Sequence, residues 1–369
     1  MGVAAAMPLA AACSPIVSAP DRRWESWRVL RDSSLSEDGR MIDHGHNDLR
    51  TTSEGQSYAL FFALVDGDRE TFDRILAWTQ NNLAGGDMAA RLPAWLWGRH
   101  AASGEWRMLD DNPASDSDLW LAYALLEGAR LWRRPELQRI ADGMLSRIRE
   151  LEITQLPGLG AMLLPGPHGF VEKDHWRLNP SYLPIPLLRR FATHDHEGPW
   201  AALASHTARM LKETAPYGFA PDWTAWRPTG FFTDPVKGPV GSYDAIRTYL
   251  WAGMTHRDDP ACRYVLRSLQ GPLDLLRSRG LVAEEVDTRT GQVTGEGPYG
   301  FHAALLPYLK AQGETRMAMR LRAGLPTPER QRGDEPAYYS HMLGLFGSGW
   351  FDGRYRFGKD GGLSPAWAR

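Results

Sequence analysis

Three carboxylate side chains occur at the starts of predicted helices, a position from which several acids can converge on one site. Glu54 lies in SEGQSYALFF, Asp116 in SDSDLWLAYALL and Asp244 in SYDAIRTYLWAG. Each acid follows a serine by one or two residues and precedes an apolar helical pattern. Two such acids can perform general acid–base catalysis. One protonates a leaving oxygen while the other activates water or attacks the substrate, which is what cleavage of a glycosidic bond requires.

Glu54 also has a purely structural interpretation. Ser53 and Gln56 have the spacing of a capping box, which places Glu54 in a first helical turn. An acid there stabilises the helix by under about 1 kcal/mol, but the helix dipole also lowers its pKa, whereas a general acid must keep its proton. A catalytic Glu54 therefore needs desolvation or a nearby acid such as Asp116 to raise its pKa. Gly55 leaves room for a substrate close to this helix start.

Helical patterns recur along the chain in two alternating sets, with hardly any period-two strand patterns between them. One set carries many charges and predicts outer helices, whereas the other is apolar on several faces and predicts buried ones. The outer helices are expected to start near residues 22, 68, 135, 197, 260 and 314, and the inner ones near residues 53, 115, 179, 242, 298 and 335. This alternation predicts an all-α fold, an (α/α)6 barrel, with an open helical solenoid as the alternative.

The longest expected connections run from outer to inner helices and are rich in Trp, Gly and Pro. They span residues 83–114, 151–179, 215–241 and 280–297. If inner helices alternate with outer ones, all six inner helices start at the end of the barrel that carries these connections. Long loops gathered at one end of a rigid scaffold commonly form a binding surface. The three acids are therefore expected to face one cleft.

The composition indicates a globular protein and excludes some classes of binding partner. The 369 residues are 43% hydrophobic and 23% charged, which is typical of a globular protein. The 42 basic and 44 acidic residues give a net charge of −2, so the chain offers no broad basic surface to a nucleic acid. The 15 tryptophans outnumber the 12 phenylalanines and the 12 tyrosines. Indole combines a flat apolar face with an N–H donor, which suits a ligand that is both apolar and polar.

The first 19 residues are expected to be a processed segment that precedes a single catalytic domain at residues 20–369. They are small and apolar, too short to span a bilayer, and similar to the end of a secretory signal. This pattern indicates a periplasmic or secreted protein with no transmembrane span. Cys13 follows three alanines, so a lipid anchor at Cys13 is the alternative. The only other cysteine is Cys262, which excludes a disulfide framework.

Three further patterns in the sequence suggest other kinds of site. Histidine clusters at residues 43–48 and 194–197 have the residue types of a metal site, but no third cluster accompanies them, so we expect no metal. The glycines of LPGLGAMLLPGPHGF lack the spacing of a phosphate-binding loop, and no cofactor is expected. Trp95 and Trp97, in LPAWLWGRH, are candidates for a sugar-stacking surface, with core packing as the alternative.

Several segments resemble glycoside hydrolase family 8, and most closely the endoglucanases that accompany bacterial cellulose synthase. The segments are SEGQSYAL, ASDSDLWLAYALLEGARLW, NPSYLPIPLLRRF, SYDAIR and GLFGSGWFDGRYRFGKDGGL. Together they cover roughly residues 21–363. Ser117 and Gly128 depart from the second motif, where the family usually has Ala or Gly at the first position and Ala at the second. Both changes replace one small residue by another.

The resemblance implies an (α/α)6 barrel that cleaves β-1,4-glucan with inversion. By motif match, Glu54 is implied as the general acid, Asp244 as the general base, and Asp116 as the residue that holds and distorts the sugar at the cleavage point. Substrate contacts are implied for Tyr182, Tyr243 and Arg247. Arg247 also follows Asp244 by three residues on one helix face, where its charge favours the ionised carboxylate.

The function implied by the resemblance is that of an inverting endo-β-1,4-glucanase that trims cellulose chains in the periplasm. β-1,4-Glucan is then the main partner, and a cellulose synthase complex is a further one. The first alternative keeps the fold and the acids but acts on xylan, chitosan or mixed-linkage glucan. A non-catalytic glucan-binding scaffold is the second alternative. It would predict the loss of a carboxylate, and all three are present.

Overall fold

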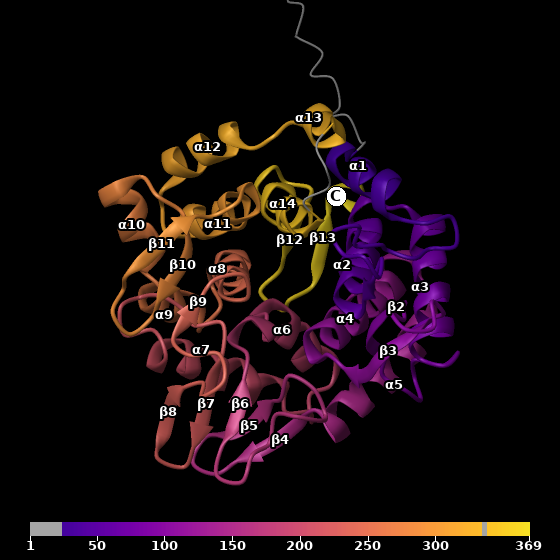
Figure 1. The fold of residues 1–369 in the computed structure, drawn as a ribbon, viewed down its shortest axis with the longest axis horizontal. Coiled ribbons are helices and arrows are strands. Elements are labelled where there is room, and N and C mark those ends of the chain that lie inside the picture. The colour runs from indigo at the N-terminus through magenta and orange to yellow at the C-terminus, as the bar shows by residue number, and fades with distance from the viewer. Residues whose placement is uncertain (1–23, 334–337) are drawn as a thin grey trace, which may run out of the picture.

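Inner and outer helices alternate along the chain and close into a ring in the computed structural model, which describes residues 24–333 and 338–369 (Figure 1). The inner helices are α2 (Ser53–Asp66), α4 (Ser115–Trp132), α6 (Ile185–His194), α8 (Ala245–Met254), α11 (Tyr299–Ala311) and α14 (Tyr338–Phe351). The outer helices are α1 (Glu25–Ser34), α3 (Arg69–Leu83), α5 (Pro135–Leu151), α7 (Trp200–Glu213), α9 (Cys262–Ser268) with α10 (Gly271–Arg279), and α12 (Thr315–Gly324). A short helix, α13 (Pro328–Gly333), follows α12. The predicted (α/α)6 barrel is confirmed.

Burial separates the two sets of helices as the apolar patterns predicted. The outer helix α5 buries one stripe, with Leu137, Ala141, Met144 and Ile148 at helical spacing, and exposes its charged side chains. The inner helix α4 is instead buried on nearly every side. The predicted starts near residues 22 and 335 lie outside the described residues, as do the processed segment at residues 1–19 and Cys13. No helix within the described ranges combines the length and hydrophobicity needed to cross a membrane.

An aromatic cluster fills the middle of the ring and joins the first inner helix to the last. The Phe346 ring of α14 stacks on that of Phe61 of α2, with centroids 5.5 Å apart. Tyr58 and Trp120 meet the same Phe346 ring at 4.8 Å and 5.0 Å. All four side chains are almost completely buried. Aromatic pairs of this kind stabilise a core beyond the area that they bury.

The C-terminal hairpin of β12 (Tyr355–Phe357) and β13 (Leu363–Pro365) fastens the end of the chain to α4. The fully buried carboxylate of Glu127 accepts a hydrogen bond from the Leu363 backbone N–H at 2.6 Å and ion pairs with Arg190 at 2.5 Å. The Tyr123 hydroxyl donates to the Gly361 carbonyl at 2.8 Å. A 3-10 helix, η2 (Ala366–Ala368), follows the hairpin. These bonds tie the segment after the last inner helix to α4 and, through Arg190, to α6.

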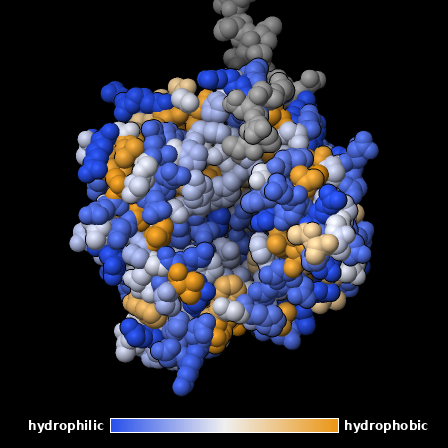
Figure 2. Space-filling view, in the orientation of Figure 1, coloured by the Kyte–Doolittle hydropathy of each residue, from blue (hydrophilic) through white to orange (hydrophobic). Residues whose placement is uncertain are grey.

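The long connections contain short antiparallel strands that the sequence patterns did not predict. One sheet holds β1 (Thr51–Thr52), β2 (Ala94–Arg99) and β3 (Trp106–Pro113). A second sheet holds β6 (Trp176–Leu178), β7 (Thr224–Arg227) and β8 (Gly230–Thr233). A third sheet holds β9 (Val240–Gly241), β10 (Ala283–Asp287) and β11 (Val293–Glu296). A two-stranded sheet pairs β4 (Ile153–Leu156) with β5 (Gly160–Leu163). Most of these strands are too short to show an alternating pattern, and several pair across long loops. Figure 2 shows the viewed face hollowed near the centre of the ring, with mostly hydrophilic surroundings.

Candidate active site

The cap of helix α2 differs from the one that the sequence predicted. Thr52, rather than Ser53, caps the helix, and its hydroxyl accepts a hydrogen bond from the Gly55 N–H at 3.0 Å. Gln56 does not complete a capping box. Its side chain is buried and points away from the helix start, where it accepts from the Met41 N–H at 2.6 Å. The predicted box was wrong because this polar side chain is used to bind a distant segment.

Gly55 is also needed for a different reason from the one predicted. A side chain at this position would collide with the hydroxyl of Tyr338, at the start of α14. The group that lies close to Gly55 is therefore a side chain of the protein and not a substrate. Glu54, one residue earlier, keeps 27% of its side chain exposed, so a substrate oxygen can reach it.

Helix α8 is capped by a residue that the sequence analysis missed. Asp222 accepts hydrogen bonds from the backbone N–H groups of Ser242 and Ala245, both at 2.7 Å, and from the Ser242 hydroxyl at 2.6 Å. Asp244 occupies the N-cap position but makes no capping hydrogen bond. Because Asp222 satisfies the helix start, both oxygens of Asp244 are available for other contacts.

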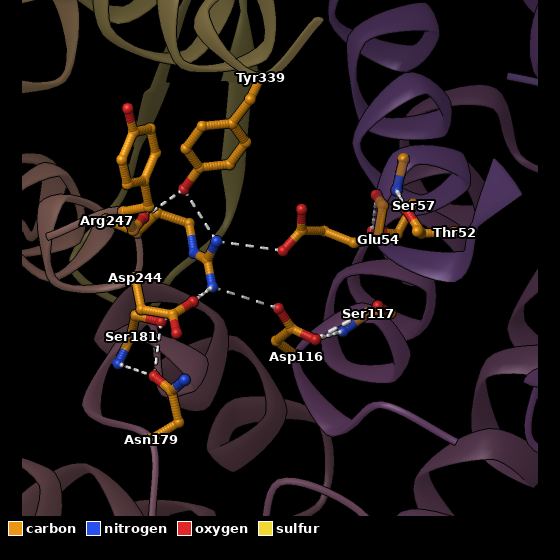
Figure 3. Close-up of polar contacts among 12 residues, drawn as sticks. Thr52, Glu54, Ser57, Asp116, Ser117, Asn179, Ser181, Asp244, Arg247 and Tyr339 are labelled. Atoms are coloured by element: carbon orange, nitrogen blue, oxygen red, sulfur yellow. Dashed lines mark hydrogen bonds and ion pairs between the residues drawn. The ribbon is translucent and has the colours of Figure 1, made fainter. Parts of the chain in front are cut away.

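The guanidinium of Arg247 brings the three predicted acids together. Its Nη1 lies 3.2 Å from Glu54 Oε2, and its Nη2 lies 2.8 Å from Asp244 Oδ1. Asp116 Oδ2 is 3.8 Å from the same Nη2. Figure 3 shows Glu54 and Asp116 on one side of the guanidinium and Asp244 on the other. Side chains from α2, α4 and α8 therefore meet at one point, as their places at helix starts predicted.

Hydrogen bonds from two further segments fix the position of Arg247. Its Nη2 donates to the Ser181 hydroxyl at 3.0 Å, and Nη1 donates to the Tyr339 hydroxyl at 2.9 Å. The Ser181 hydroxyl donates in turn to Asn179 Oδ1 at 2.7 Å, at the start of the 3-10 helix η1 (Pro180–Tyr182). Tyr339 donates to the Tyr243 carbonyl at 2.6 Å. A buried guanidinium with this many partners has one orientation.

The surroundings of Glu54 favour its protonated form. Burial raises the pKa of Glu54 to about 8; the charge of Arg247 opposes this shift, and the charges of Asp116 and Asp244 add to it. This resolves the conflict with the helix dipole, because desolvation and neighbouring acids outweigh the dipole. Glu54 can then hold a proton at neutral pH and donate it. A carboxylic acid beside a separate carboxylate is the arrangement that acid–base hydrolysis requires.

Asp116 is set deeper than the other two acids. Its side chain is buried, and its Oδ1 accepts a hydrogen bond from the Ser117 N–H at 2.7 Å. Its Oδ2 has no hydrogen-bond partner among the described residues. Burial also raises the pKa of Asp116, against the attraction of Arg247. An unsatisfied buried oxygen that faces the other acids is placed to accept a hydrogen bond from a bound hydroxyl group.

The two predicted tyrosines lie beside the acids. The Tyr182 ring, on η1, is 5.9 Å from the Arg247 guanidinium. Tyr243 is 45% exposed, and its hydroxyl donates to Glu284 at 2.8 Å. Tyr182 therefore lies against the arginine that joins the acids, whereas the Tyr243 hydroxyl is engaged by Glu284.

The two predicted tryptophans have different surroundings on strand β2. The Trp97 ring stacks on Trp106, with centroids 5.2 Å apart, and meets the edge of Trp78 at 5.4 Å. Trp97 pairs in register with Thr51, whose buried hydroxyl accepts from Arg40 Nε and donates to the Met41 carbonyl. Trp95 is half-buried. The Trp97 ring is thus used in packing within the protein, and Trp95 stays the candidate for stacking on a ligand.

Trp223 belongs to the site but was not singled out by the sequence analysis. Its indole N–H donates to Asp244 Oδ2 at 3.0 Å. Its ring stacks on Phe170 at 5.8 Å, and the Arg177 guanidinium lies 5.1 Å from it. The only signal was its place in a Trp-rich connection, residues 215–241, because its neighbours in the sequence form no motif.

A second pair of acids lies next to the first. Asp118 is in the first turn of α4, two residues after Asp116, and Glu152 directly follows α5. Both are fully buried, and no described group outside this pair donates a hydrogen bond to their carboxyl oxygens. The two carboxyls are hydrogen-bonded to each other, and burial raises the pKa of each well above its usual range. At least one of them therefore keeps its proton at neutral pH.

The histidine clusters have ordinary partners where the structure describes them. His46 pairs with Asp43 at 3.4 Å, and His194 pairs with Asp142 at 2.6 Å. In the described parts of the chain, no three His, Cys, Asp or Glu side chains are grouped as metal ligands would be.

Comparison with known proteins identifies relatives over almost the whole chain. Residues 2–353 match the model of a family described as glycosyl hydrolases family 8. An endoglucanase of Xanthomonas axonopodis pv. citri (strain 306) is 51% identical, over 99% of this chain and 94% of the relative. An endoglucanase of Escherichia coli (strain K12) is 43% identical, over 94% of this chain and 92% of the relative.

Solved structures give the same result. The endo-1,4-D-glucanase from Vibrio fischeri ES114 superposes with a TM-score of 0.88 at 41% identity, covering 94% of this chain and all of that one. The endo-β-1,4-glucanase CMCax from Acetobacter xylinum superposes with a TM-score of 0.73 at 26% identity, covering 88% of this chain and 96% of that one.

Proposed function

The chain belongs to family 8 of the glycosyl hydrolases, and from this premise we propose that it is an inverting endo-β-1,4-glucanase that hydrolyses cellulose chains. The motif resemblance in the sequence is thereby confirmed at the level of the family. The observation that carries the proposal is the meeting of Glu54, Asp116 and Asp244 around Arg247. The endoglucanase relatives at 40–51% identity support the choice of substrate.

In the proposed mechanism, Glu54 is the general acid. Its proton passes to the glycosidic oxygen as the bond from that oxygen to the anomeric carbon breaks. Asp244 is the general base: its carboxylate takes a proton from a water molecule that attacks the anomeric carbon from the opposite face. After one cycle Glu54 is ionised and Asp244 is protonated, and exchange with solvent restores both. One water molecule is consumed for each bond that is cut.

Asp116 and Arg247 have supporting roles in this proposal. Asp116 accepts a hydrogen bond from a sugar hydroxyl at the cleavage point through its unpartnered Oδ2, which holds the ring in a distorted shape. Arg247 stabilises the ionised forms of the acids and fixes the distance between them. Tyr182, Tyr243 and the exposed part of Trp95 then contact neighbouring sugars, since aromatic faces stack on pyranose rings.

The distance between the two acids has an upper bound that covers both the inverting and the retaining range, so the product anomer decides between them. Glu54 Oε2 and Asp244 Oδ1 contact the two terminal nitrogens of one planar guanidinium, so these oxygens are at most about 8 Å apart. An inverting pair is typically about 6.5–9.5 Å apart, to admit a water molecule, and a retaining pair about 5–5.5 Å. The product of an inverting enzyme acting on a β-linkage is the α-anomer.

We place the enzyme in the periplasm or outside the cell, in the service of cellulose biosynthesis. Residues 1–19 would then be a signal that is removed, residues 20–369 the catalytic domain, and a cellulose synthase complex a partner. Intact mass of the mature protein tests this proposal. A start near residue 20 supports a secretory signal, whereas a lipid-modified Cys13 would favour the anchored form.

Two measurements test the activity. Reducing-end release from carboxymethylcellulose, xylan, chitosan and mixed-linkage glucan should be greatest on carboxymethylcellulose. A clear preference for another polymer would keep the mechanism but replace the substrate. Proton NMR of fresh digests should show the α-anomer first. Initial accumulation of the β-anomer would overturn the assigned roles of Glu54 and Asp244.

A further inference from the structure

An exposed aromatic ring lies on the β1–β2–β3 sheet, away from the acids. Trp106 of β3 is 45% exposed. It stacks on Trp97 of β2 with an angle of 14° between the ring planes. Trp97 and the Arg40 guanidinium both lie against this indole, and the exposed area is the part of the ring that they leave uncovered. Part of a flat indole surface is therefore open to solvent in a fixed orientation.

Buried contacts hold this stack in place. The guanidinium of Arg40 lies 4.4 Å from the Trp97 ring centre and 4.6 Å from that of Trp106. Arg40 is itself buried, and its Nε donates to the Thr51 hydroxyl at 2.9 Å. Trp78 of α3 supports Trp97 from the side. The exposed ring is thus the outermost layer of a packed cluster, and little conformational entropy is lost when a ligand stacks on it.

A polar cavity of about 500 Å³ adjoins the same sheet. Arg99 contributes to its wall and is the register partner of Trp106, so both side chains lie on one face of the sheet. The polar side chains that line the cavity are those of His46, Asn47, Asp48, Arg50, Arg99 and His100. An open aromatic face beside a row of donors and acceptors matches a sugar chain, whose ring faces are apolar and whose edges carry hydroxyls.

We propose that Trp106 and this cavity form a second binding site for β-1,4-glucan, separate from the acids. The inference rests on the proposed glucanase function, which makes this polymer the ligand at hand. No residue lining the cavity belongs to the acid cluster. The site is nevertheless connected to the acids, because β1 ends at Thr52, the cap of the helix that carries Glu54. A chain bound here keeps the enzyme on a long substrate between cuts, whereas a short oligosaccharide needs only the acid site.

The test compares Trp106→Ala with a control, Tyr217→Ala, which removes another exposed aromatic ring, one that is 56% exposed. Native gels that contain soluble β-1,4-glucan polymer measure binding, and reducing-end assays on cellotetraose measure cleavage at the acids. Trp106→Ala should weaken retention on the polymer about fivefold, as loss of one stacked ring typically does, and leave kcat/KM on cellotetraose within about twofold. The control should change neither quantity.

Arg99→Ala provides a second variant, because this exposed side chain lies beside the stack without supporting it. It should also reduce retention on the polymer. Unchanged retention in both variants would overturn the second site, and so would an equal loss on polymer and tetramer at an unchanged melting temperature. Failure of the proposed function gives a different result: the wild-type protein would be retained by the polymer yet release no reducing ends from it.

Discussion

The first turns of the inner helices and their later turns are built on opposite principles. In the first turns, Glu54 and Asp116 approach each other around Arg247, and Asp116 has an oxygen without a hydrogen bond. One to two turns further along the same helices, Phe61 and Trp120 pack edge to face at 4.9 Å in a fully buried cluster. Like charges and unsatisfied oxygens cost stability, whereas packed rings supply it. The reactive ends are therefore held in place by the apolar turns behind them.

This contrast predicts that chemistry and stability can be separated along a single helix. Substitutions in the first turns should remove activity and preserve the fold. Substitutions in the later turns should do the reverse. Glu54 and Phe61, on the same helix α2, provide the most direct test of this separation.

Glu54→Gln should have the largest effect. Gln keeps the size of the side chain but has no proton for the leaving oxygen, so hydrolysis should fall by about 10²–10⁴-fold, which is the usual contribution of a general acid. The melting temperature should be unchanged or slightly higher, because folding at neutral pH no longer requires a buried acid at this position to take up a proton. Glu70→Gln is a matched control, since Glu70 is also a first-turn acid, on outer helix α3. A Glu54→Gln enzyme that retained a third of its activity would remove Glu54 from the mechanism.

Phe61→Ala should produce the reverse result in the same helix. Its ring contacts Phe346, Trp120 and Tyr355 and is fully buried, so truncation should lower the free energy of unfolding by about 3–5 kcal/mol. Chemical denaturation measures this loss. The kcat of the molecules that remain folded should stay within about twofold of wild type. A large loss of kcat at unchanged stability would show that the two regions are not separable.

Glu152→Gln should have a smaller effect that depends on pH. Burial raises the pKa of Glu152 in the folded protein, so the folded state binds more protons than the unfolded state. Unfolded acids titrate near pH about 4. The free energy of unfolding therefore falls as the pH rises from there towards the raised pKa of the folded state. Gln removes one of the two groups responsible and can still donate to Asp118. The fall in melting temperature between pH 5 and pH 9 should therefore be smaller than in wild type. Glu150→Gln, at an exposed surface position, should leave the pH dependence unaltered.

Trp95→Ala and Trp97→Ala should have the smallest effects and should differ from each other. If Trp95 stacks on sugar, its loss should weaken oligosaccharide affinity by about 1 kcal/mol with little change in melting temperature. Trp97→Ala should instead lower the melting temperature, because its ring is packed between Trp78 and Trp106. Calorimetric titration with cellotetraose and thermal melts measure both quantities. Weakened affinity with an unchanged melting temperature in Trp97→Ala would exchange the two assignments.

The barrel could be predicted because its signals are local. The stripe of apolar residues in α5 and the all-round apolar surface of α4 each appear within one helix length of sequence. Because the three acids lie at the starts of inner helices, and all inner helices start at the same end of the barrel, the acids were expected to lie together at that end. The motif resemblance added roles to these positions, and those roles remain predictions until they are tested by mutation.

What could not be predicted depends on contacts between distant segments. Gln56 has the spacing of a cap, but its amide donates to Thr79 on the next helix at 2.8 Å. Asp222 caps a helix from 20 residues away, across a connection that has no helical or strand period. Trp223 reaches Asp244 from the same connection. A sequence pattern records which residues lie on one helix face, and it does not record which loop folds over that face.

Closure of the ring by its last segments has a consequence for the order in which the molecule can form. The aromatic cluster of α2 needs Phe346, and the buried Glu127 needs the backbone of Leu363. At typical synthesis rates, α14 leaves the ribosome roughly 15–60 seconds after α2. During that interval the first inner helix has no partner for one aromatic face, so the ring stays open until the chain is almost complete.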